Sequence, residues 1–246
     1  MSLLPWCHGT GVLEWRPSLP LLAKDAMDGY AILQLGGLAL FTAVVTARTV
    51  TLRRRIRRNP IRLLSSNGSR DLPALLLFVE VNLWVADVLL HLLWSAFRPL
   101  PGWAYAPLVA APGVRLAGAA LSLGGLAIFG AALVALGESW RLGIDADRPG
   151  RLVTSGIYRH SRHPIYVFFV LYALGAFLMN GNAVALGLAL VIAVTAAWQI
   201  IREEAFLLAT YGDAYRTYAA RTGRLVTMPA HLFRRPGERA PVREEP

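Results

Sequence analysis

The stretch "PIYVFFVLYALGAFLMNGNAVALGLALVIAVTAAWQII" (164–201) decides the fold. It contains no charged residue and is interrupted by the polar triplet "NGN" at 180–182. A helix needs roughly 20 apolar residues to cross the roughly 30 Å hydrocarbon core of a bilayer. Because so short a turn can only reverse the chain, the pattern predicts an antiparallel hairpin of two spanning helices, Pro164–Met179 and Ala183–Ile201.

The rest of the chain has the same apolar character. Of its 246 residues, 55% are hydrophobic and only 16% are charged, whereas a soluble domain carries about 25% charged residues. Three further apolar segments are long enough to span, at Tyr30–Ala47, Leu72–Phe97 and Val114–Leu136. We therefore predict an all-α integral membrane protein with about five transmembrane helices, including a C-terminal helical hairpin.

The arginines predict the orientation of these helices. The formal net charge is +10, and arginine supplies nearly all of the positive charge. Arginines crowd the segments 48–70, 141–162 and 202–224, whereas 98–113 has only Arg98 and 180–182 has none. By the positive-inside rule, the N-terminus should lie outside and the C-terminus in the cytoplasm. Because these arginines flank apolar segments, we expect them to contact lipid rather than nucleic acid.

The cysteine and histidine content argues against a metal site. A single cysteine, Cys7, excludes an intramolecular disulfide and a cysteine-built metal site. The five histidines are too few for a site built from clustered histidines. The N-terminal stretch lacks the basic region of a secretory signal. We therefore expect the first spanning helix to act as the insertion signal.

The segment that follows the hairpin predicts a tail helix. Leu208, Tyr211, Tyr215 and Tyr218 recur at helical spacing, with charged residues on the other faces. Such an amphipathic helix either lies against the membrane surface or caps the bundle. From Pro229 onward the chain is rich in Pro, Arg and Glu, which predicts a disordered tail over 230–246.

A polar cluster is predicted where the hairpin opens. "GIYRHSRHPIY" (156–166) enters the fourth spanning helix and "QIIREEAF" (199–206) leaves the fifth, so the tight turn places these ends side by side at the cytoplasmic face. As plain interfacial anchors, two adjacent glutamates would oppose the prevailing positive charge. A functional site is therefore the better interpretation. Its candidate members are Tyr158, Arg159, Arg162, His163, Tyr166, Gln199, Arg202, Glu203 and Glu204.

A second polar face lies on the second spanning segment. Glu80, Asp87 and His91 fall within about 40° of one another around a helix. Charged residues at membrane depth are costly and usually face the interior of a bundle. They could serve an acceptor site or an aqueous pocket, or they could hold helices together.

The two motifs resemble those of a known enzyme family. "LVTSGIYRHSRHPIY" (152–166), a short hairpin, and "REEAFLLATYGDAYRTYAART" (202–222) together resemble the isoprenylcysteine carboxyl methyltransferase family and the phospholipid N-methyltransferases that share the pattern. "LGESWRLGI" (136–144) is similar to the bacterial branch. The resemblance implies a bacterial inner-membrane protein with helices in 1–110, a methyltransferase core in 111–229, and a lipid or lipidated small-molecule substrate.

The resemblance also implies S-adenosylmethionine as cofactor, at the cytoplasmic end of the hairpin. The positions that match the family's cofactor contacts are Leu152, Val153, Tyr158, His163, Pro164, Ile165, Tyr166 and Glu203. Arg159 or Arg162 could hold the cofactor carboxylate. Catalytic roles would fall on Arg202, Glu204 and Arg162, with the acceptor near Gln199 and the Glu80, Asp87 and His91 face.

One departure from the family keeps the acceptor open. The eukaryotic members carry an arginine one helical turn before the glutamate pair, where this chain has Gln199. The expected acceptor is a lipophilic carboxylate, and the alternatives are a phospholipid amine and a small thiol. A sterol-type reductase of related fold that uses NADPH, or an inactive membrane scaffold, are the remaining alternatives. The sequence does not determine the oligomeric state.

Overall fold

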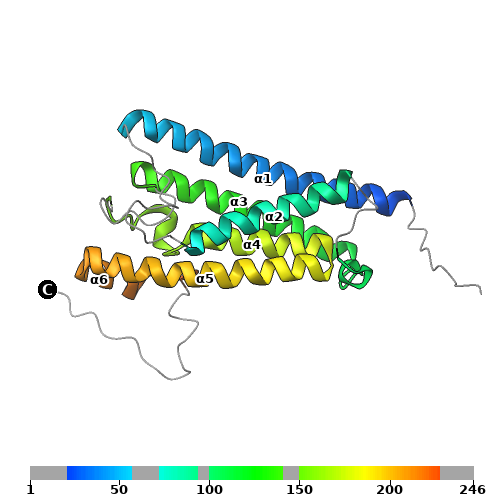
Figure 1. Cartoon of the computed structure of the whole chain (residues 1–246). Coiled ribbons are helices and arrows are strands. Elements are labelled where there is room, and N and C mark those ends of the chain that lie inside the picture. The colour runs from blue at the N-terminus through cyan, green and yellow to red at the C-terminus, as the bar shows by residue number, and fades with distance from the viewer. Residues whose placement is uncertain (1–20, 57–71, 94–99, 141–149, 228–246) are drawn as a thin grey trace, which may run out of the picture.

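The computed structural model describes residues 21–56, 72–93, 100–140 and 150–227, which form a helical bundle (Figure 1). Six α-helices make up the bundle: α1 (Leu21–Ile56), α2 (Leu72–Leu93), α3 (Pro112–Leu136), α4 (Pro164–Asn180), α5 (Ala183–Tyr211) and α6 (Asp213–Arg221). Short 3₁₀ turns lie at η1 (Gly102–Tyr105), η2 (Gly137–Ser139) and η3 (Gly156–Arg159). Within these ranges no β-strand occurs, so the predicted all-α class is confirmed.

The described part of each of the five predicted spanning segments lies on an α-helix. Helical stretches at Gly29–Arg54, Pro112–Leu136 and Ala183–Tyr211 are long and apolar enough to cross a membrane, and Leu75–Ala86 and Pro164–Asn180 are shorter apolar helices. These apolar helices indicate an integral membrane protein. The number of crossings and their direction stay predictions.

Two of the predicted helix limits are wrong. The first helix continues past Ala47 to Ile56 and therefore carries arginines that we assigned to the following loop. The fifth continues ten residues past Ile201, to Tyr211. No glycine or proline interrupts 202–211, and Gly212 ends the helix with a φ of 52° that a side chain would disfavour. The glutamate pair therefore stands on α5 itself, where a rigid helix sets its position.

The turn between α4 and α5 is built as the sequence predicts. Gly181 adopts a left-handed conformation (φ 67°), and the Asn182 side chain accepts a hydrogen bond from the backbone N–H of Ala185 at 2.9 Å, which caps α5. Leu108 donates its N–H to the Gly181 carbonyl at 2.6 Å. A Cβ at Gly181 would overlap the backbone of Val109. The predicted antiparallel hairpin is thus confirmed, and the α2–α3 connection closes against its turn.

Small residues bring α3 and α4 into close contact. A Cβ added at Gly118 would lie 2.6 Å from the carbonyl oxygen of Gly175, and one at Gly175 would overlap Ser122. A Cβ at Gly125 would lie 3.3 Å from the carbonyl oxygen of Phe168. Small residues at a helix interface allow this close backbone approach in membrane bundles. The contact fixes the start of α4, and hence the polar cluster, against α3.

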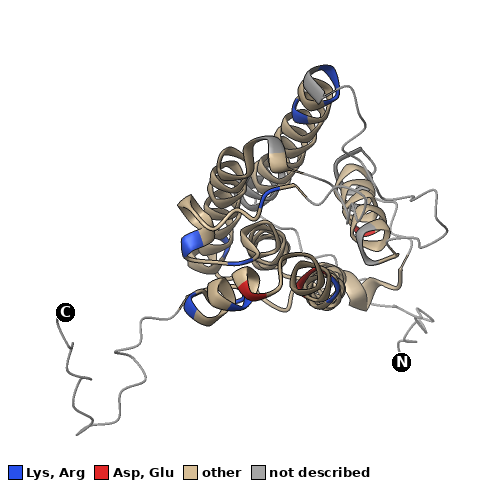
Figure 2. Cartoon of the chain, turned by 90° about the vertical axis from the view of Figure 1, so that its left-hand side faces the viewer, with Lys and Arg blue, Asp and Glu red and all other residues tan. Residues whose placement is uncertain are grey.

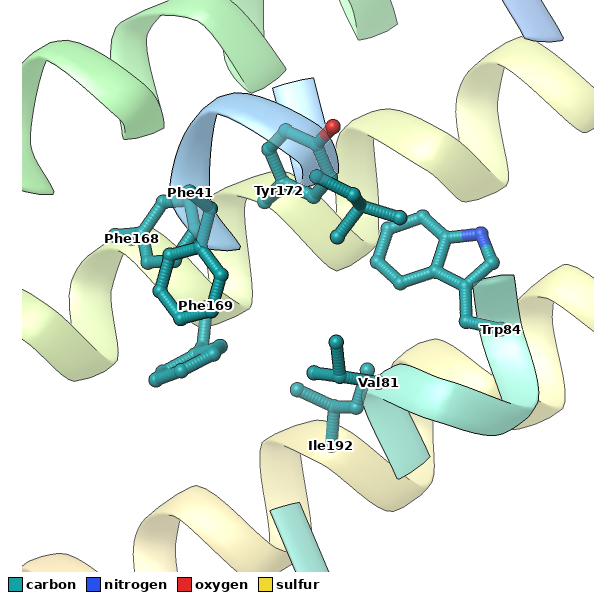
Figure 3. Close-up of a pocket in the computed structure, with 8 residues that line it drawn as sticks. Phe41, Val81, Trp84, Phe168, Phe169, Tyr172 and Ile192 are labelled. Carbon is teal, nitrogen blue, oxygen red and sulfur yellow. The ribbon is translucent and has the colours of Figure 1, made fainter. Parts of the chain in front are cut away.

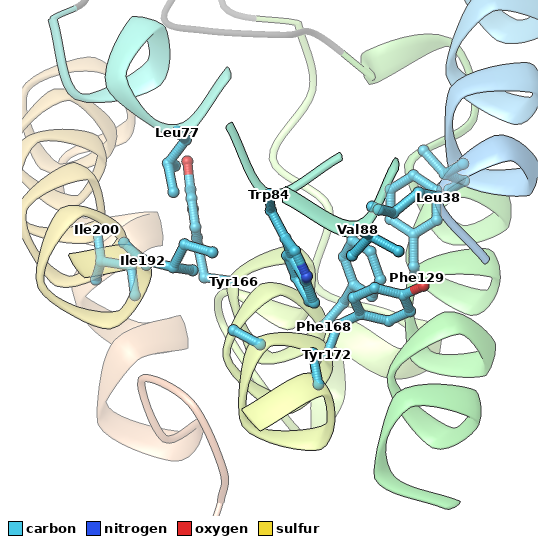
Figure 4. Packing of buried hydrophobic residues seen from close by; sticks show 14 of the residues in the cluster. Leu38, Leu77, Trp84, Val88, Phe129, Tyr166, Phe168, Tyr172, Ile192 and Ile200 are labelled. Carbon is cyan, nitrogen blue, oxygen red and sulfur yellow. The ribbon is translucent and has the colours of Figure 1, made fainter. Parts of the chain in front are cut away.

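One apolar cluster contains buried side chains from all five helices α1, α2, α3, α4 and α5. Each helix contributes buried side chains, among them Leu38, Trp84, Phe129, Phe168 and Ile192 (Figure 4). At the hairpin end, the buried Gln34 of α1 exchanges side-chain hydrogen bonds of 3.0 and 3.2 Å with Asn180. The division of the chain near residue 110 stays a prediction, and the predicted disordered tail at 230–246 lies outside the described residues.

Candidate active site

The polar cluster forms where α4 begins and α5 approaches its end. Pro164 occupies the first turn of α4, where its missing N–H costs no hydrogen bond. His163 directly precedes it and is only 4% exposed. Figure 2, which looks down the bundle from the α6 end, shows acidic and basic residues gathered on α5, α6 and the adjoining loops. The predicted meeting of the two motif ends is therefore confirmed.

His163 lies between the two adjacent glutamates of α5. Its Nδ1 is 3.6 Å from Oε2 of Glu203, and its Nε2 is 3.3 Å from Oε1 of Glu204. Tyr166, one turn further along α4, donates its hydroxyl hydrogen to Oε1 of Glu203 at 2.5 Å. The side chain of Glu203 remains 26% exposed. Glu203 is therefore held in place by α4 while part of its carboxylate stays accessible.

Glu204 is the centre of an ion-pair network. Arg162 approaches its Oε1 to 3.1 Å, and Arg224 binds both carboxylate oxygens, with contacts of 2.6 Å to Oε2 and 3.1 Å to Oε1. The carboxylate raises the pKa of Arg224 through this hydrogen bond. The Glu204 side chain is 13% exposed. Two guanidinium groups, those of Arg162 and Arg224, therefore already bind this carboxylate.

The segment after α6 closes over the start of α4. Tyr218 donates its hydroxyl hydrogen to the Tyr158 carbonyl at 2.7 Å. The Arg162 N–H donates to the Gly223 carbonyl at 3.0 Å, and the Thr227 N–H donates to the His160 carbonyl at 2.7 Å. We call residues 222–227 the tail strap. Through Arg224 the strap also reaches Glu204, so the tail completes the site.

Buried tyrosines line the junction between α6 and the site. Tyr215 and Tyr218 are buried, and Arg162 donates a hydrogen bond to the Tyr215 hydroxyl at 3.3 Å. Burial raises the pKa of Tyr158, Tyr215 and Tyr218. The tail helix was predicted either to lie against the membrane surface or to cap the bundle. The structure shows that α6 covers the start of α4. Leu208 and Tyr211 belong to α5 instead of this helix, and Leu208 is 39% exposed.

The other predicted cofactor positions form the wall beside the polar cluster. Val153 and Tyr158 pack in one buried group with Ala132 of α3, and Ile165 covers it. Leu152 is half-buried, Pro164 is buried and Arg159 is exposed. The structure thus brings His163, Tyr166 and Glu203 into mutual contact and leaves Arg159 at the surface.

The predicted acceptor positions lie deeper in the bundle or at its side. Gln199 is fully buried one turn before Glu203, and Arg202 is half-buried on α5. Glu80 is buried and accepts a hydrogen bond from Thr195 of α5 at 2.7 Å. The side chains of Asp87 and His91 lie outside the described residues. Glu80 therefore belongs to the α2–α5 interface and not to the polar cluster itself.

A small apolar pocket of about 10 Å³ lies between α1, α2, α4 and α5. Leu38, Phe41, Val81, Trp84, Phe168, Phe169, Tyr172 and Ile192 line it (Figure 3). Phe169 connects the pocket to the cluster, since its ring centroid is 6.4 Å from that of Tyr166, one turn earlier on α4. The polar cluster and the apolar pocket are therefore adjacent.

Sequence comparison identifies the part of the chain that carries this site. The profile of the phospholipid methyltransferase family matches residues 114–214. The matched residues are less than half of the chain and include α3, α4 and α5. The match confirms the resemblance seen in the motifs.

A curated relative supports the same family. The protein-S-isoprenylcysteine O-methyltransferase of Schizosaccharomyces pombe is 44% identical over 68 residues, which are 27% of this chain and 29% of that protein. The match thus spans less than a third of the length of the yeast protein. It points to the same group of enzymes as the family profile without covering the whole of either chain.

The segment matched by the family profile contains most, but not all, of the site. His163, Tyr166, Glu203 and Glu204 lie inside it, whereas Arg224 and Glu80 lie outside the matched residues. Sequence reasoning missed Arg224 as a site residue, and it missed Thr195 as the partner of Glu80. Arg224 was counted among the arginines that set orientation. Only its position ten residues beyond the matched domain, behind the glycine at 223, hinted at a returning segment.

Proposed function

We propose that the chain is an integral membrane methyltransferase that uses S-adenosylmethionine to methylate a lipophilic acceptor, in the first instance a carboxylate. The observation that carries the proposal is the contact of His163, Tyr166 and Glu203 directly above an apolar pocket. We propose that a polar donor binds at this cluster and that the lipophilic acceptor approaches it from the bilayer side.

The polar residues suit the proposed cofactor. The Nε atom of Arg162 is buried, and no described residue hydrogen-bonds to it, so it can donate to a carboxylate. The accessible part of the Glu203 carboxylate can accept from an amine or from ribose hydroxyls. When bound, S-adenosylmethionine would supply a methyl group on a positively charged sulfur.

The protein's own task in such a reaction is positioning and exclusion of water. Tyr166 fixes Glu203 through its short hydrogen bond, and His163 braces both glutamates. The Gly223 carbonyl of the tail strap holds the Arg162 backbone, and Glu204 of α5 holds the Arg162 side chain through an ion pair. These contacts would hold a bound cofactor at the cluster in one orientation.

The hydrogen bonds and ion pairs that Glu203 and Glu204 already make favour a carboxylate acceptor. A carboxylate is ionised near pH 7 and needs no general base, whereas an amine or a thiol must lose a proton. Glu203 already accepts from Tyr166, and Glu204 accepts from two arginines. Arg202, on α5 beside Glu203, is the proposed partner of the acceptor carboxylate. The name of the matched family favours a phospholipid amine as the second candidate.

Binding and turnover measurements test the proposal. Calorimetry should show binding of S-adenosylhomocysteine to the full-length protein and no binding of NADPH. Labelled methyl transfer should then be screened in a membrane lipid extract, a prenylcysteine analogue and small thiols. A carboxylate acceptor predicts a kcat that is flat from about pH 6 to 8, with a raised KM for Arg202→Gln. NADPH binding instead would refute the methyltransferase proposal, and a steep pH dependence with an unchanged KM would favour the amine or thiol.

A further inference from the structure

The tail strap is a tight turn with an apolar tip. At its base, the Gly223 N–H donates to the Thr227 hydroxyl at 2.8 Å, and that hydroxyl donates to the His160 carbonyl at 2.8 Å. A Cβ added at Gly223 would overlap the carbonyl oxygen of Val226. Leu225 is 39% exposed and Val226 is 64% exposed. The turn therefore presents two consecutive apolar side chains, which we call the strap tip, toward the surroundings.

The strap tip lies beside an exposed apolar row of α5. Arg224, which directly precedes the tip, binds both carboxylate oxygens of Glu204. Ile201 and Leu208 lie one turn before and one turn after Glu204, so the three share one face of α5. Ile201 is 59% exposed and Leu208 is 39% exposed. Since α5 is long and apolar enough to cross a membrane, this row faces lipid, and the strap tip continues it.

Exposed arginines surround the strap tip. The side chains of Arg216 and Arg224 are 65% and 54% exposed, and Arg221 is also exposed. Asp213, which pairs with Arg216, is an exposed acidic residue at the same end. A single exposed apolar residue is common on any protein, but two apolar residues among arginines are typical of a segment in the headgroup region of a bilayer. There the arginines bind lipid phosphates.

The strap also holds the loop that leads into α4. Its Gly223 carbonyl accepts from the Arg162 N–H at 3.0 Å, and the Thr227 N–H donates to the His160 carbonyl at 2.7 Å. Together with the pair of Arg224 and Glu204, these contacts join the strap to the polar cluster. Contacts near the surface with few apolar neighbours open at low free-energy cost. An anchor at the strap tip would keep them closed.

We infer that Leu225 and Val226 insert into the headgroup–acyl boundary of the bilayer and thereby hold the tail strap on the polar cluster. The partner is the phospholipid surface, with its phosphates on Arg221 and on the exposed part of Arg224. The strap lies beyond the matched residues 114–214. The inference goes beyond the proposed function, since it depends on neither the cofactor nor the methyl acceptor.

Depth-dependent quenching tests the insertion in the full-length protein. The native Cys7 is first changed to serine, and single cysteines at Val226, Val194 and Asp213 receive the same environment-sensitive fluorophore. In nanodiscs of phosphatidylcholine and phosphatidylglycerol, a lipid with a doxyl quencher near its headgroup should quench the label at Val226 at least twofold more than the label at Asp213. Val194, 69% exposed in the middle of α5, is the control within the bilayer, and Asp213, whose side chain is 91% exposed, is the control in water.

Amide hydrogen exchange in the same nanodiscs tests the link to the polar cluster. The double variant Leu225→Ser and Val226→Ser should raise exchange about tenfold in peptides that cover 160–163 and 222–227. Tenfold corresponds to losing the burial of two partly exposed apolar side chains. Exchange within α6, over 213–221, should stay unchanged and shows that the bundle is intact. Arg224→Gln, which removes the ion pair directly, should raise exchange in the same two peptides by about fivefold.

Each outcome decides the inference. Quenching at Val226 together with faster exchange in the double variant supports it. A label at Val226 that is quenched no more than the label at Asp213 overturns it, and faster exchange in that case assigns the tip a packing role within the protein. Quenching without any change of exchange overturns the link between the membrane and the polar cluster. Because no cofactor is needed in either measurement, failure here is distinct from failure of the proposed function.

Discussion

Arg162 and Arg224 offer a matched test of the ion-pair network, because both bind Glu204 but differ in exposure. The Arg162 side chain is 14% exposed, whereas that of Arg224 is 54% exposed. Changing each to glutamine removes the same charge and keeps a side chain of similar shape. The expected difference therefore depends mainly on burial, with a further contribution from the hydrogen bond of Arg162 to Tyr215.

The expected losses follow from that difference. Arg162→Gln leaves a carboxylate that is only 13% exposed without its buried partner, and it also removes the 3.3 Å hydrogen bond to Tyr215. Breaking a buried ion pair costs about 3 kcal/mol. Solvent screens the Arg224 pair, although its two-pronged contact is well formed, so we expect Arg224→Gln to cost about 1 kcal/mol or less.

Equilibrium denaturation in mixed micelles, followed by tryptophan fluorescence, measures both losses. The exposed Arg159 is the control, and Arg159→Gln should change the free energy of unfolding by less than about 0.5 kcal/mol. Equal losses for Arg162→Gln and Arg224→Gln, or a larger loss for Arg224→Gln, would refute the assignment of Glu204 as a buried centre.

Three further predictions concern the cofactor, the topology and the tail. Tyr166→Phe should weaken S-adenosylhomocysteine binding by about fivefold in calorimetry, with an unchanged helical circular dichroism spectrum, because Glu203 loses its hydrogen bond. In a chain without Cys7, a cysteine at Asn182 should react with an impermeant external thiol reagent and one at Ser155 should not; the reverse labelling pattern would contradict the proposed orientation. Burial raises the pKa of Tyr218, so its contribution to stability should be complete below about pH 10 and be lost as the pH rises further. Denaturation between pH 8 and 11 should show a shallower loss in Tyr218→Phe than in the wild type, and parallel slopes would contradict the burial of this hydroxyl.

Much of the fold was predictable because it depends on local patterns. Apolar length predicts spanning helices in any lipid-facing chain, since every backbone N–H and C=O must be paired within the helix. The triplet at 180–182 leaves the chain no option but reversal, and Gly181 and Asn182 supply the conformation and the cap that such a turn needs. The same constraint brought 156–166 beside the glutamate pair.

The helix limits and the roles within the site depended on longer-range packing. The continuation of α5 to Tyr211 was missed because the change from apolar to charged residues was taken as the helix end, although Glu, Ala and Leu favour helix. Whether Glu204 would be a base or the centre of an ion-pair network depended on Arg224, which reaches it from 20 residues further along the chain.

The sequence by itself determined an all-helical membrane protein with a hairpin that joins two polar motifs, because hydrophobic length and turn chemistry act between near neighbours. Only the tertiary structure decided which groups share a bond: the strap that returns through Arg224 to Glu204, and the contact of Glu80 with Thr195 across two helices, 115 positions apart in sequence. Contacts of this kind depend on how helices rotate and slide against one another. That choice is fixed by close-packed small residues such as Gly118 and Gly175, and no periodicity within a single helix specifies it.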